Sequence, residues 1–577
     1  MRRVALFALL ALAGCATRPV AVAPVAPRPV EVQILAINDF HGNLEPPKIA
    51  IEVIGTDAAG AKVPAGGVAY LAAAAKTLRS DQPHSVTVSA GDMIGGSPLV
   101  SALFLDEPAI EAMEEVGVEY NAVGNHEFDK GSAELLRMQR GGCAKHTTKQ
   151  PCRVEPFDGG DFRFLAANVL TGDGRTLFPG TAIKDFGPVQ VGFIGMTLKE
   201  TATLVTPAGV AGLSFADEAA TANAAVPALK AAGADAIVLL IHQGARTAGA
   251  YDDKLCPGLS GDILPIIARL DPAIDVVISG HTHAAYICEV PRAARARPVL
   301  LTSAGRYGTL ISDIRLTFAP GGALAGHRAE NVIVQGEGYM AGNVPVPVTP
   351  AYPRFAADPA TKALVDRYAA AAAPEAARAV GKLAGPVTRT ETQDREQTAG
   401  NLVADAQLAA SRGHGAQIAF INSGGVRTDL VPAADGSVTY GQIFAMQPFG
   451  NNLVVKMLTG AQLKALLEQQ FASGTNTAQK PNMLLASKGF FFAYDLSRPA
   501  GDRIVDMRLS GRRIDPTAPY RITVNNFLAS GGDNFTVLAA AGGAVDAGLD
   551  LDALEAWLKQ GARIPDLGRI DDRTPRP

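Results

Sequence analysis

Five short polar segments, each directly after an apolar run, constrain this sequence more than any other feature. They are NDFHG at 38–42, GD at 91–92, GNHEFD at 124–129, His242, and GHTH at 280–283. The apolar runs before them are rich in β-branched residues, as buried strands are. One histidine at a strand end usually makes an ordinary hydrogen bond, but five such segments are hard to explain by packing. We therefore expect an α/β domain whose strand ends gather one polar site.

Short apolar runs alternate with helix-like stretches from residue 32 to about 316, which is typical of a layered α/β domain. At 577 residues the chain is too long for one ordinary core, so we expect more than one domain. The expected strands are 32–37, 85–89, 164–167, 189–196, 236–241 and 276–279, and the expected helices are 67–79, 107–116 and 218–232.

An alanine-rich stretch at about 358–380 consists almost entirely of helix formers and predicts a linker helix. A second α/β region follows it, with strands at 418–421 and 520–525 and a helix at 460–471. The expected plan is a catalytic domain at 31–345, a helical linker at 346–380 and a second domain at 381–570.

Residues 1–15 predict an export signal, because a basic start precedes an apolar run that is too short to span a membrane. The run ends in LAGC, which resembles the bacterial lipobox, in which Cys15 becomes the acylated first residue. The alternative is a plain secretory signal with an incidental cysteine. Residues 16–30, rich in Pro, Ala and Val, predict an extended tether. We expect a lipoprotein on the periplasmic face of a bacterial membrane, and Ala16 is compatible with the outer membrane.

Four further cysteines, an even number, suit an oxidising compartment. Three pairings are possible, and we favour Cys143–Cys152 and Cys256–Cys288 because each closes a local loop. A zinc knuckle is the alternative, but the sequence has no C-x-x-C spacing to support it.

The residue types of the five segments suit a pair of divalent metal ions. Two ions roughly 3.5–4 Å apart can hold the attacking and leaving oxygens of a phosphoryl transfer. They need a bridging carboxylate, imidazoles on both ions, and open positions for water and phosphate. From the alternation in Asp39-x-His41 and His281-x-His283 we expect both side chains of each pair on one side of an extended segment, aimed at the same ion.

The ordered motifs NDFHG, GD, GNHEFD, a lone histidine and GHTH resemble the calcineurin-like metallophosphoesterases, and later motifs resemble the 5'-nucleotidase family. The resemblance implies a four-layer β-sandwich domain joined by a helical linker to an α/β substrate-binding domain. It also implies that His126 is the catalytic histidine and that Asp129 orients it. His283 stands where several 5'-nucleotidases have an amide, which leaves the preferred ion open. The implied ligands are Asp39, His41 and His283 for one ion, Asn125, His242 and His281 for the other, and Asp92 as the bridge.

Motifs of the second region resemble the family's substrate-binding positions. Two phenylalanines resemble the rings that sandwich the nucleobase, and such stacking tolerates different bases. An aspartate resembles the acceptor of the ribose hydroxyls, and two arginines with an asparagine resemble phosphate- and ribose-side positions. These residues are Arg395, Asn422, Arg427, Phe449, Phe527 and Asp533.

The resemblance implies hydrolysis of nucleoside 5'-monophosphates by in-line attack of a metal-activated water, with Zn, Mn, Co or Mg as the ions. Cleavage of UDP-sugars, NAD or 2',3'-cyclic nucleotides is the alternative within the enzyme class. A nucleotide-binding lipoprotein without catalysis is a further alternative, disfavoured by the intact His126, Asp129 and metal ligands. The net charge of −4 shows no excess of basic residues that would bind a nucleic acid polymer. We therefore expect only a small-molecule substrate and the membrane as partners.

Overall fold

Two six-stranded sheets form the centre of the N-terminal domain, and each contains a block of parallel strands. In the first sheet β1, β4, β5 and β6 run parallel; in the second β9, β11, β12 and β14 do. The first sheet has the order β16 (Leu324–Ile333), β15 (Leu310–Phe318), β1 (Val30–Ile37), β4 (Ser85–Ser89), β5 (Val118–Ala122), β6 (Arg163–Leu165). The second has the order β13 (Ala285–Val290), β14 (Val299–Ala304), β12 (Ile274–Ser279), β11 (Ala236–Ile241), β9 (Gln190–Met196), β8 (Thr181–Asp185).

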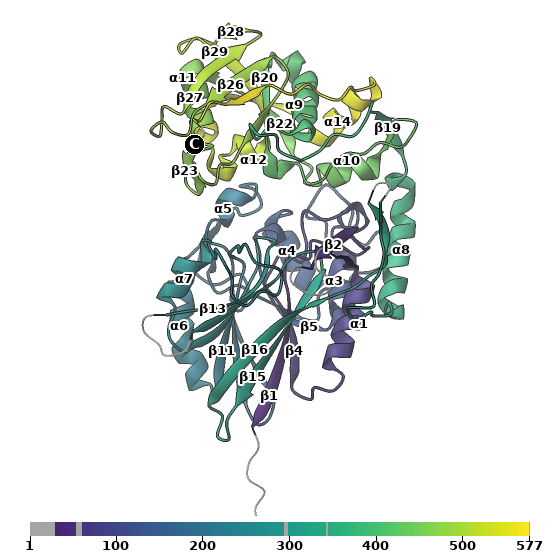
Figure 1. Cartoon of the computed structure of the whole chain (residues 1–577), viewed down its shortest axis with the longest axis vertical. Coiled ribbons are helices and arrows are strands. Elements are labelled where there is room, and N and C mark those ends of the chain that lie inside the picture. The colour runs from purple at the N-terminus through teal and green to yellow at the C-terminus, as the bar shows by residue number, and fades with distance from the viewer. Residues whose placement is uncertain (1–28, 54–60, 293–297, 342–343, 576–577) are drawn as a thin grey trace, which may run out of the picture.

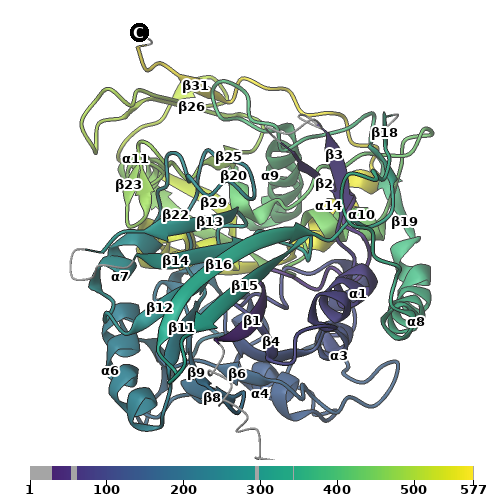
Figure 2. The ribbon, with the colours of Figure 1, turned by 60° about the horizontal axis from the view of Figure 1, so that its bottom comes forward.

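The N-terminal domain has four layers because apolar side chains alternate between the two faces of these strands. Each sheet therefore packs against the other sheet on one face and against helices on the other. In β1, Ile34 belongs to the core between the two sheets, whereas Leu35 and Ile37 belong to the core beneath helices. The helices α1 (Val68–Arg79) and α3 (Glu107–Val116) cover the first sheet, and α6 (Glu218–Ala231) and α7 (Ile263–Arg269) cover the second (Figure 2). The expected helix–sheet–sheet–helix sandwich is therefore confirmed.

The structure, a computed structural model, describes residues 29–53, 61–292, 298–341 and 344–575. The expected signal at 1–15, Cys15, and most of the tether at 16–30 lie outside the described residues. The shorter elements of the N-terminal domain are β2 (Ile49–Glu52), β3 (Lys62–Ala65), α2 (Leu99–Ala102), η1 (His126–Phe128), α4 (Ser132–Arg140), β7 (Val169–Thr171), α5 (Thr201–Leu204), β10 (Leu213–Phe215), β17 (Tyr339–Ala341) and β18 (Val344–Val346).

The linker helix α8 (Pro359–Ala376) runs along one side of the molecule from the N-terminal to the C-terminal body (Figure 1). Asp358 caps it by accepting a hydrogen bond from the backbone N–H of Thr361, and Tyr368 packs into the core with α1 and α3. The expected helix over 358–380 is too long at its end, because β19 (Ala379–Lys382) enters the C-terminal domain and buries Val380 there. Within the described residues, neither α8 nor any other helix has the length and apolarity to cross a membrane.

A five-stranded sheet and a four-stranded sheet build the C-terminal domain around one main core, with a small second apolar cluster beside it. The larger has the order β25 (Leu484–Ala486), β20 (Ile418–Asn422), β29 (Pro519–Asn525), β22 (Asn452–Thr459), β30 (Gly542–Leu549); the smaller has β28 (Arg512–Arg513), β27 (Ile504–Leu509), β26 (Phe490–Tyr494), β31 (Ile570–Asp572). The remaining elements are α9 (Thr398–Ser411), η2 (Arg412–His414), η3 (Ser423–Gly425), β21 (Ser437–Thr439), α10 (Tyr440–Met446), α11 (Gly460–Glu468), β23 (Ala472–Ser473), β24 (Asn476–Thr477), α12 (Asn526–Ala529), η4 (Gly532–Asn534), α13 (Thr536–Ala540) and α14 (Asp550–Lys559).

Both favoured disulfides are present. Cys143 bonds to Cys152 within the loop after α4, and Cys256 bonds to Cys288, which lies on β13. Each bridge closes a local segment, and the second lies against the N-terminal sheets.

Candidate active site

The structure brings all seven expected metal ligands together at one edge of the paired sheets. Each follows a strand of a parallel block, and the carboxyl ends of parallel strands share an edge. The ligands are Asp39 and His41 after β1, Asp92 after β4, Asn125 after β5, His242 after β11, and His281 and His283 after β12.

One half of the cluster converges on a point between Asp39, His41 and His283. The Nε2 atoms of His41 and His283 lie 3.1 Å apart, and His283 Nε2 lies 3.4 Å from Asp39 Oδ1. Asp92 Oδ2 lies 3.6 Å from His41 Nε2 and 3.0 Å from His242 Nε2. Asp92 therefore stands between two groups of donors, as a bridging carboxylate must.

The other half of the cluster contains His242, Asn125 and His281. His281 Nδ1 lies 3.1 Å from Asn125 Oδ1, a separation that suits two ligands of one ion at about 2.1 Å each. The Nδ1 of His242 lies 2.8 Å from the carbonyl oxygen of Ala90, and that of His41 lies 2.7 Å from the carbonyl oxygen of Gly95. Each Nδ1–H can donate to its carbonyl, which leaves Nε2 free as a lone-pair donor toward the cluster.

Backbone strain is concentrated at these positions. Five of the seven expected ligands have positive φ although none is glycine: Asp39 (49°), His41 (48°), Asp92 (53°), His281 (69°) and His283 (57°). Such conformations cost of order 1–3 kcal/mol each and persist where the surrounding structure imposes them. The expectation of extended segments at Asp39-x-His41 and His281-x-His283 is therefore wrong, because left-handed backbone turns these side chains toward the cluster.

The cluster fits divalent metal ions by its own chemistry. The Nε2 atom of His242 is buried and has no hydrogen-bond partner among the described residues, although it lies beside Asp92. Burial lowers the pKa of His41 and of His281 to about 3, so both imidazoles are neutral and able to ligate. Burial, with a contribution from Asp92, raises the pKa of Asp39 to about 7, and a bound cation would offset this cost.

The expected catalytic pair is assembled beside the cluster. His126 Nδ1 lies 2.8 Å from Asp129 Oδ2, and its backbone N–H donates to Asp92 Oδ1 at 2.9 Å. Burial alone would lower the pKa of His126, but Asp129 and Asp92 together raise it above its usual value. Its ring stacks on Phe449 at 5.8 Å and 13°, and the Arg427 guanidinium lies 5.6 Å from the centre of that phenyl ring.

Five of the six expected substrate residues line the same cavity as His126 and Asp129. A pocket of about 170 Å³ is lined by His126 and Asp129 from the N-terminal domain and by residues of the C-terminal domain. Asn422 Nδ2 donates to Asp533 Oδ2 at 2.7 Å, and a Cβ on Gly532 would lie 2.4 Å from the Phe527 ring, so this ring rests on the glycine. The five residues are Asn422, Arg427, Phe449, Phe527 and Asp533.

Arg395 is the substrate residue that the structure does not bring to this cavity. Its guanidinium lies 3.9 Å from Glu391, and it does not line the pocket with the other five. Arg389 approaches Arg427 instead, donating to its carbonyl oxygen at 3.2 Å, and both line an adjoining cavity of about 380 Å³. The sequence interpretation did not name Arg389, which lies two residues after Val387, the partner of Leu430 in an antiparallel bridge.

Two further residues of the motifs were given no role from the sequence. Asn38 donates to Asp39 Oδ2 at 2.6 Å and to the carbonyl oxygen of Gly305. Glu127 is buried and accepts from the backbone N–H groups of Asp92, Met93 and Gly124. Their presence inside NDFHG and GNHEFD was the available signal, and the structure shows that they hold the ligand loops in place.

Comparison with known proteins finds the same two domains. A model of the calcineurin-like phosphoesterase family matches residues 32–285, and a model of the 5'-nucleotidase C-terminal domain matches residues 379–540. A solved 5'-nucleotidase precursor from Thermus thermophilus superposes with a TM-score of 0.75 at 27% identity, covering 94% of this chain and 99% of that one.

Two curated relatives align over most of the chain. The 5'-nucleotidase of Bos taurus is 27% identical over 553 residues, which cover 89% of this chain and 85% of that protein. Endonuclease YhcR of Bacillus subtilis is 29% identical over 503 residues, 87% of this chain. The chain spans only 37% of the length of the Bacillus relative.

Paired sheets with an Asp/His cluster at their shared edge define the class, a calcineurin-like phosphoesterase. The second domain narrows the assignment. The chain belongs to the 5'-nucleotidase family of hydrolases, in which the phosphoesterase domain is followed by a 5'-nucleotidase C-terminal domain.

Proposed function

We propose that the protein is an exported, metal-dependent 5'-nucleotidase that converts nucleoside 5'-monophosphates to nucleoside and phosphate. One observation carries this proposal. The cavity that contains His126 lies beside the cluster of seven expected metal ligands, here called the metal-type cluster. The same cavity is also lined by Phe449, Phe527 and Asp533 of the other domain. A ligand of this cavity meets phosphate chemistry at one end and stacking and hydroxyl-binding groups at the other.

Two divalent ions fit the donor set, with Asp92 between them. We assign one ion to Asp39, His41 and His283 and the other to Asn125, His242 and His281. When bound, the ions would lower the pKa of water and neutralise charge on the phosphoryl oxygens. The chemistry of mixed oxygen and imidazole donors suits Zn, Mn, Co or Mg.

His126 contributes the proton chemistry that the protein itself supplies. Asp129 fixes its Nδ1–H, which leaves Nε2 of this cavity-lining histidine free to meet a ligand. Its raised pKa favours the protonated imidazole, which can donate a hydrogen bond to a phosphoryl oxygen and a proton to the leaving ribose oxygen.

The C-terminal residues bind the nucleoside in this proposal. Phe449 and Phe527 hold the base between them, and Asp533, steadied by Asn422, accepts hydrogen bonds from the ribose hydroxyls. Arg427 faces the phosphate, with Arg389 in the place expected of Arg395.

The adjoining cavity of about 380 Å³ favours the second candidate function, cleavage of pyrophosphates such as UDP-sugars or NAD. It contains Lys48, Arg306 and Arg389, none of which makes an ion pair with a described residue. It also contains Gly96, where an added Cβ would lie 3.5 Å from His41 Nδ1, so one side of the cavity lies next to an assigned ligand. A substrate extending past the reacting phosphorus could place a second anionic group there.

Export and lipid anchoring remain part of the proposal. Cys15 of the LAGC sequence is the proposed acylation site, and the two disulfides suit an oxidising compartment. A relative that is 29% identical is a cell wall protein of Listeria monocytogenes, of which this chain covers 65%. We place the protein at the periplasmic face, with the outer membrane favoured.

Hydrolysis of three substrates, measured side by side with Mn²⁺ present, tests this proposal: phosphate released from AMP, UMP formed from UDP-glucose, and p-nitrophenol released from bis-p-nitrophenyl phosphate. The proposed function predicts that AMP has the highest kcat/KM. If UDP-glucose exceeds AMP, the second candidate replaces the first. If none of the three is hydrolysed, the chain binds nucleotides without catalysis.

A further inference from the structure

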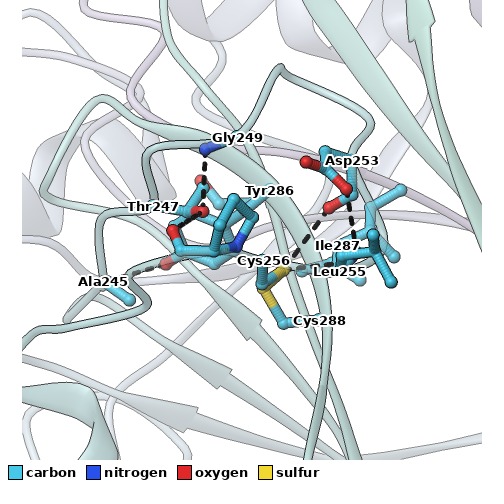
Figure 3. Close-up of a disulfide and its surroundings, with 12 residues drawn as sticks. Ala245, Thr247, Gly249, Asp253, Leu255, Cys256, Tyr286, Ile287 and Cys288 are labelled. Carbon is cyan, nitrogen blue, oxygen red and sulfur yellow. Dashed lines mark hydrogen bonds between the residues drawn. A yellow bond between two sulfur atoms is a disulfide. The ribbon is translucent and has the colours of Figure 1, made fainter.

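The Cys256–Cys288 disulfide joins the loop that begins with His242 to the strand that follows the loop with His281 and His283. Cys256 lies in the loop that begins with His242 after β11, and Cys288 lies on β13, directly after His281 and His283. Both cysteines are buried, at 9% and 1% exposure. Figure 3 shows the bridge between the loop and the strand.

Tyr286 of β13 makes a second link between this strand and the loop that begins with His242, close to the bridge in Figure 3. Its phenol oxygen accepts a hydrogen bond from the backbone N–H of Ala245 at 2.9 Å and lies 2.8 Å from Ser279 Oγ. Thr282, between the two histidines of the second loop, donates from its hydroxyl to the carbonyl oxygen of Ala245 at 2.7 Å. The backbone N–H of Ala245 is therefore held by Tyr286 of β13, and its carbonyl oxygen by Thr282 of the loop that carries His281.

The loops also touch backbone to backbone at two glycines. A Cβ on Gly244 would lie 2.3 Å from the carbonyl oxygen of Gly280, and a Cβ on Gly280 would lie 3.1 Å from His242 Nδ1. A side chain at Gly244 would clash with the carbonyl oxygen of Gly280, so the two loops are in close contact here. A change in the spacing of the loops therefore moves the His242 imidazole relative to His281.

We propose that Cys256, Cys288 and Tyr286 form a clasp that positions His242 and His281 and thereby sets the affinity for the ion they share. The proposal rests on the ligand assignment of the proposed function. Because ligands that are held in place lose less freedom on binding, the disulfide-bonded protein binds this ion more tightly than a chain without the bridge. The clasp residues are positioning residues, and none of them is assigned as a ligand.

The second disulfide offers a matched control. Cys143–Cys152 lies in the loop after α4, Cys143 is exposed, and the backbone N–H of Cys152 donates to Glu107. Within the described part of the chain, no hydrogen bond of this pair reaches an assigned metal ligand. Removing it tests the general cost of losing a bridge.

The test is calorimetric titration of chelator-stripped protein with Mn²⁺, comparing wild type, C256A/C288A, C143A/C152A and Y286F. We expect two ions per wild-type chain, and a dissociation constant for one ion that rises on the order of tenfold or more in C256A/C288A and rises in Y286F. C143A/C152A should match the wild type. Excess Mn²⁺ should restore the turnover of the two clasp variants, which a general folding defect would not allow.

If C256A/C288A and Y286F bind Mn²⁺ with the same affinity as the wild type and C143A/C152A, the clasp is overturned and the metal assignment stands. A wild-type chain that binds no Mn²⁺ would overturn both. If C256A/C288A does not fold, which circular dichroism would show, Y286F decides the outcome because it removes one hydroxyl only.

Discussion

Phe527→Ala separates nucleotide binding from phosphate chemistry. The ring lies in the shared cavity, supported by Gly532, whereas the ring that stacks on His126 is that of Phe449. Stacking contributes about 1–3 kcal/mol per base. Because about 1.4 kcal/mol corresponds to a factor of ten, the KM for AMP should rise about 5- to 150-fold.

The comparison substrate is p-nitrophenyl phosphate, which has no nucleobase to place between the two phenylalanines. Steady-state kinetics should show little change in its KM for Phe527→Ala, with kcat for both substrates near the wild-type value. Phe449→Ala should raise the KM for AMP similarly and also disturb kcat for both substrates, because Phe449 stacks on His126. His126→Ala should lower kcat for both. If Phe527→Ala impairs the two substrates equally, the proposed base clamp is wrong and the ring is structural.

Three further changes test the bridge, the catalytic pair and the anchor. Asp92→Ala should remove the bridging carboxylate and lower kcat/KM by orders of magnitude, and full activity in this variant would contradict a two-metal site. Asp129→Asn should remove a negative charge that raises the pKa of His126. The alkaline fall of kcat/KM should therefore move to lower pH, and an unmoved pH profile would contradict the pairing of His126 with Asp129. Cys15→Ser should release the protein from the membrane fraction, and a mass spectrum of the wild type showing an unacylated mature N-terminus would contradict the anchor.

The local pattern of the sequence was sufficient for the elements that position the metal-type cluster. The apolar runs before Asp39, Asp92 and His242 are buried strands, and the polar residues meet because parallel strands share a carboxyl edge. The end of α8 was misplaced because an alanine-rich stretch favours helix, whereas burial of Val380 in the C-terminal core decides where the strand β19 begins.

Other features depend on contacts between distant segments and could not be predicted from local pattern. Arg395 matches a family motif, yet the fold leaves it beside Glu391 and brings Arg389 to Arg427 instead. The stacking of Phe449 on His126 requires the placement of two domains, which no local propensity encodes. Motif resemblance therefore located the cluster better than it located the residues facing it from the C-terminal domain.

Diffraction from a crystal soaked with Mn²⁺ and a non-hydrolysable AMP analogue tests the central claim most directly. A two-metal site predicts two anomalous peaks on either side of the Asp92 carboxylate, one beside His41 and one beside His242. The base clamp predicts the nucleobase between Phe449 and Phe527. No manganese at the cluster, or an analogue bound away from both phenylalanines, would contradict the claim that one two-metal site serves nucleotides held by the second domain.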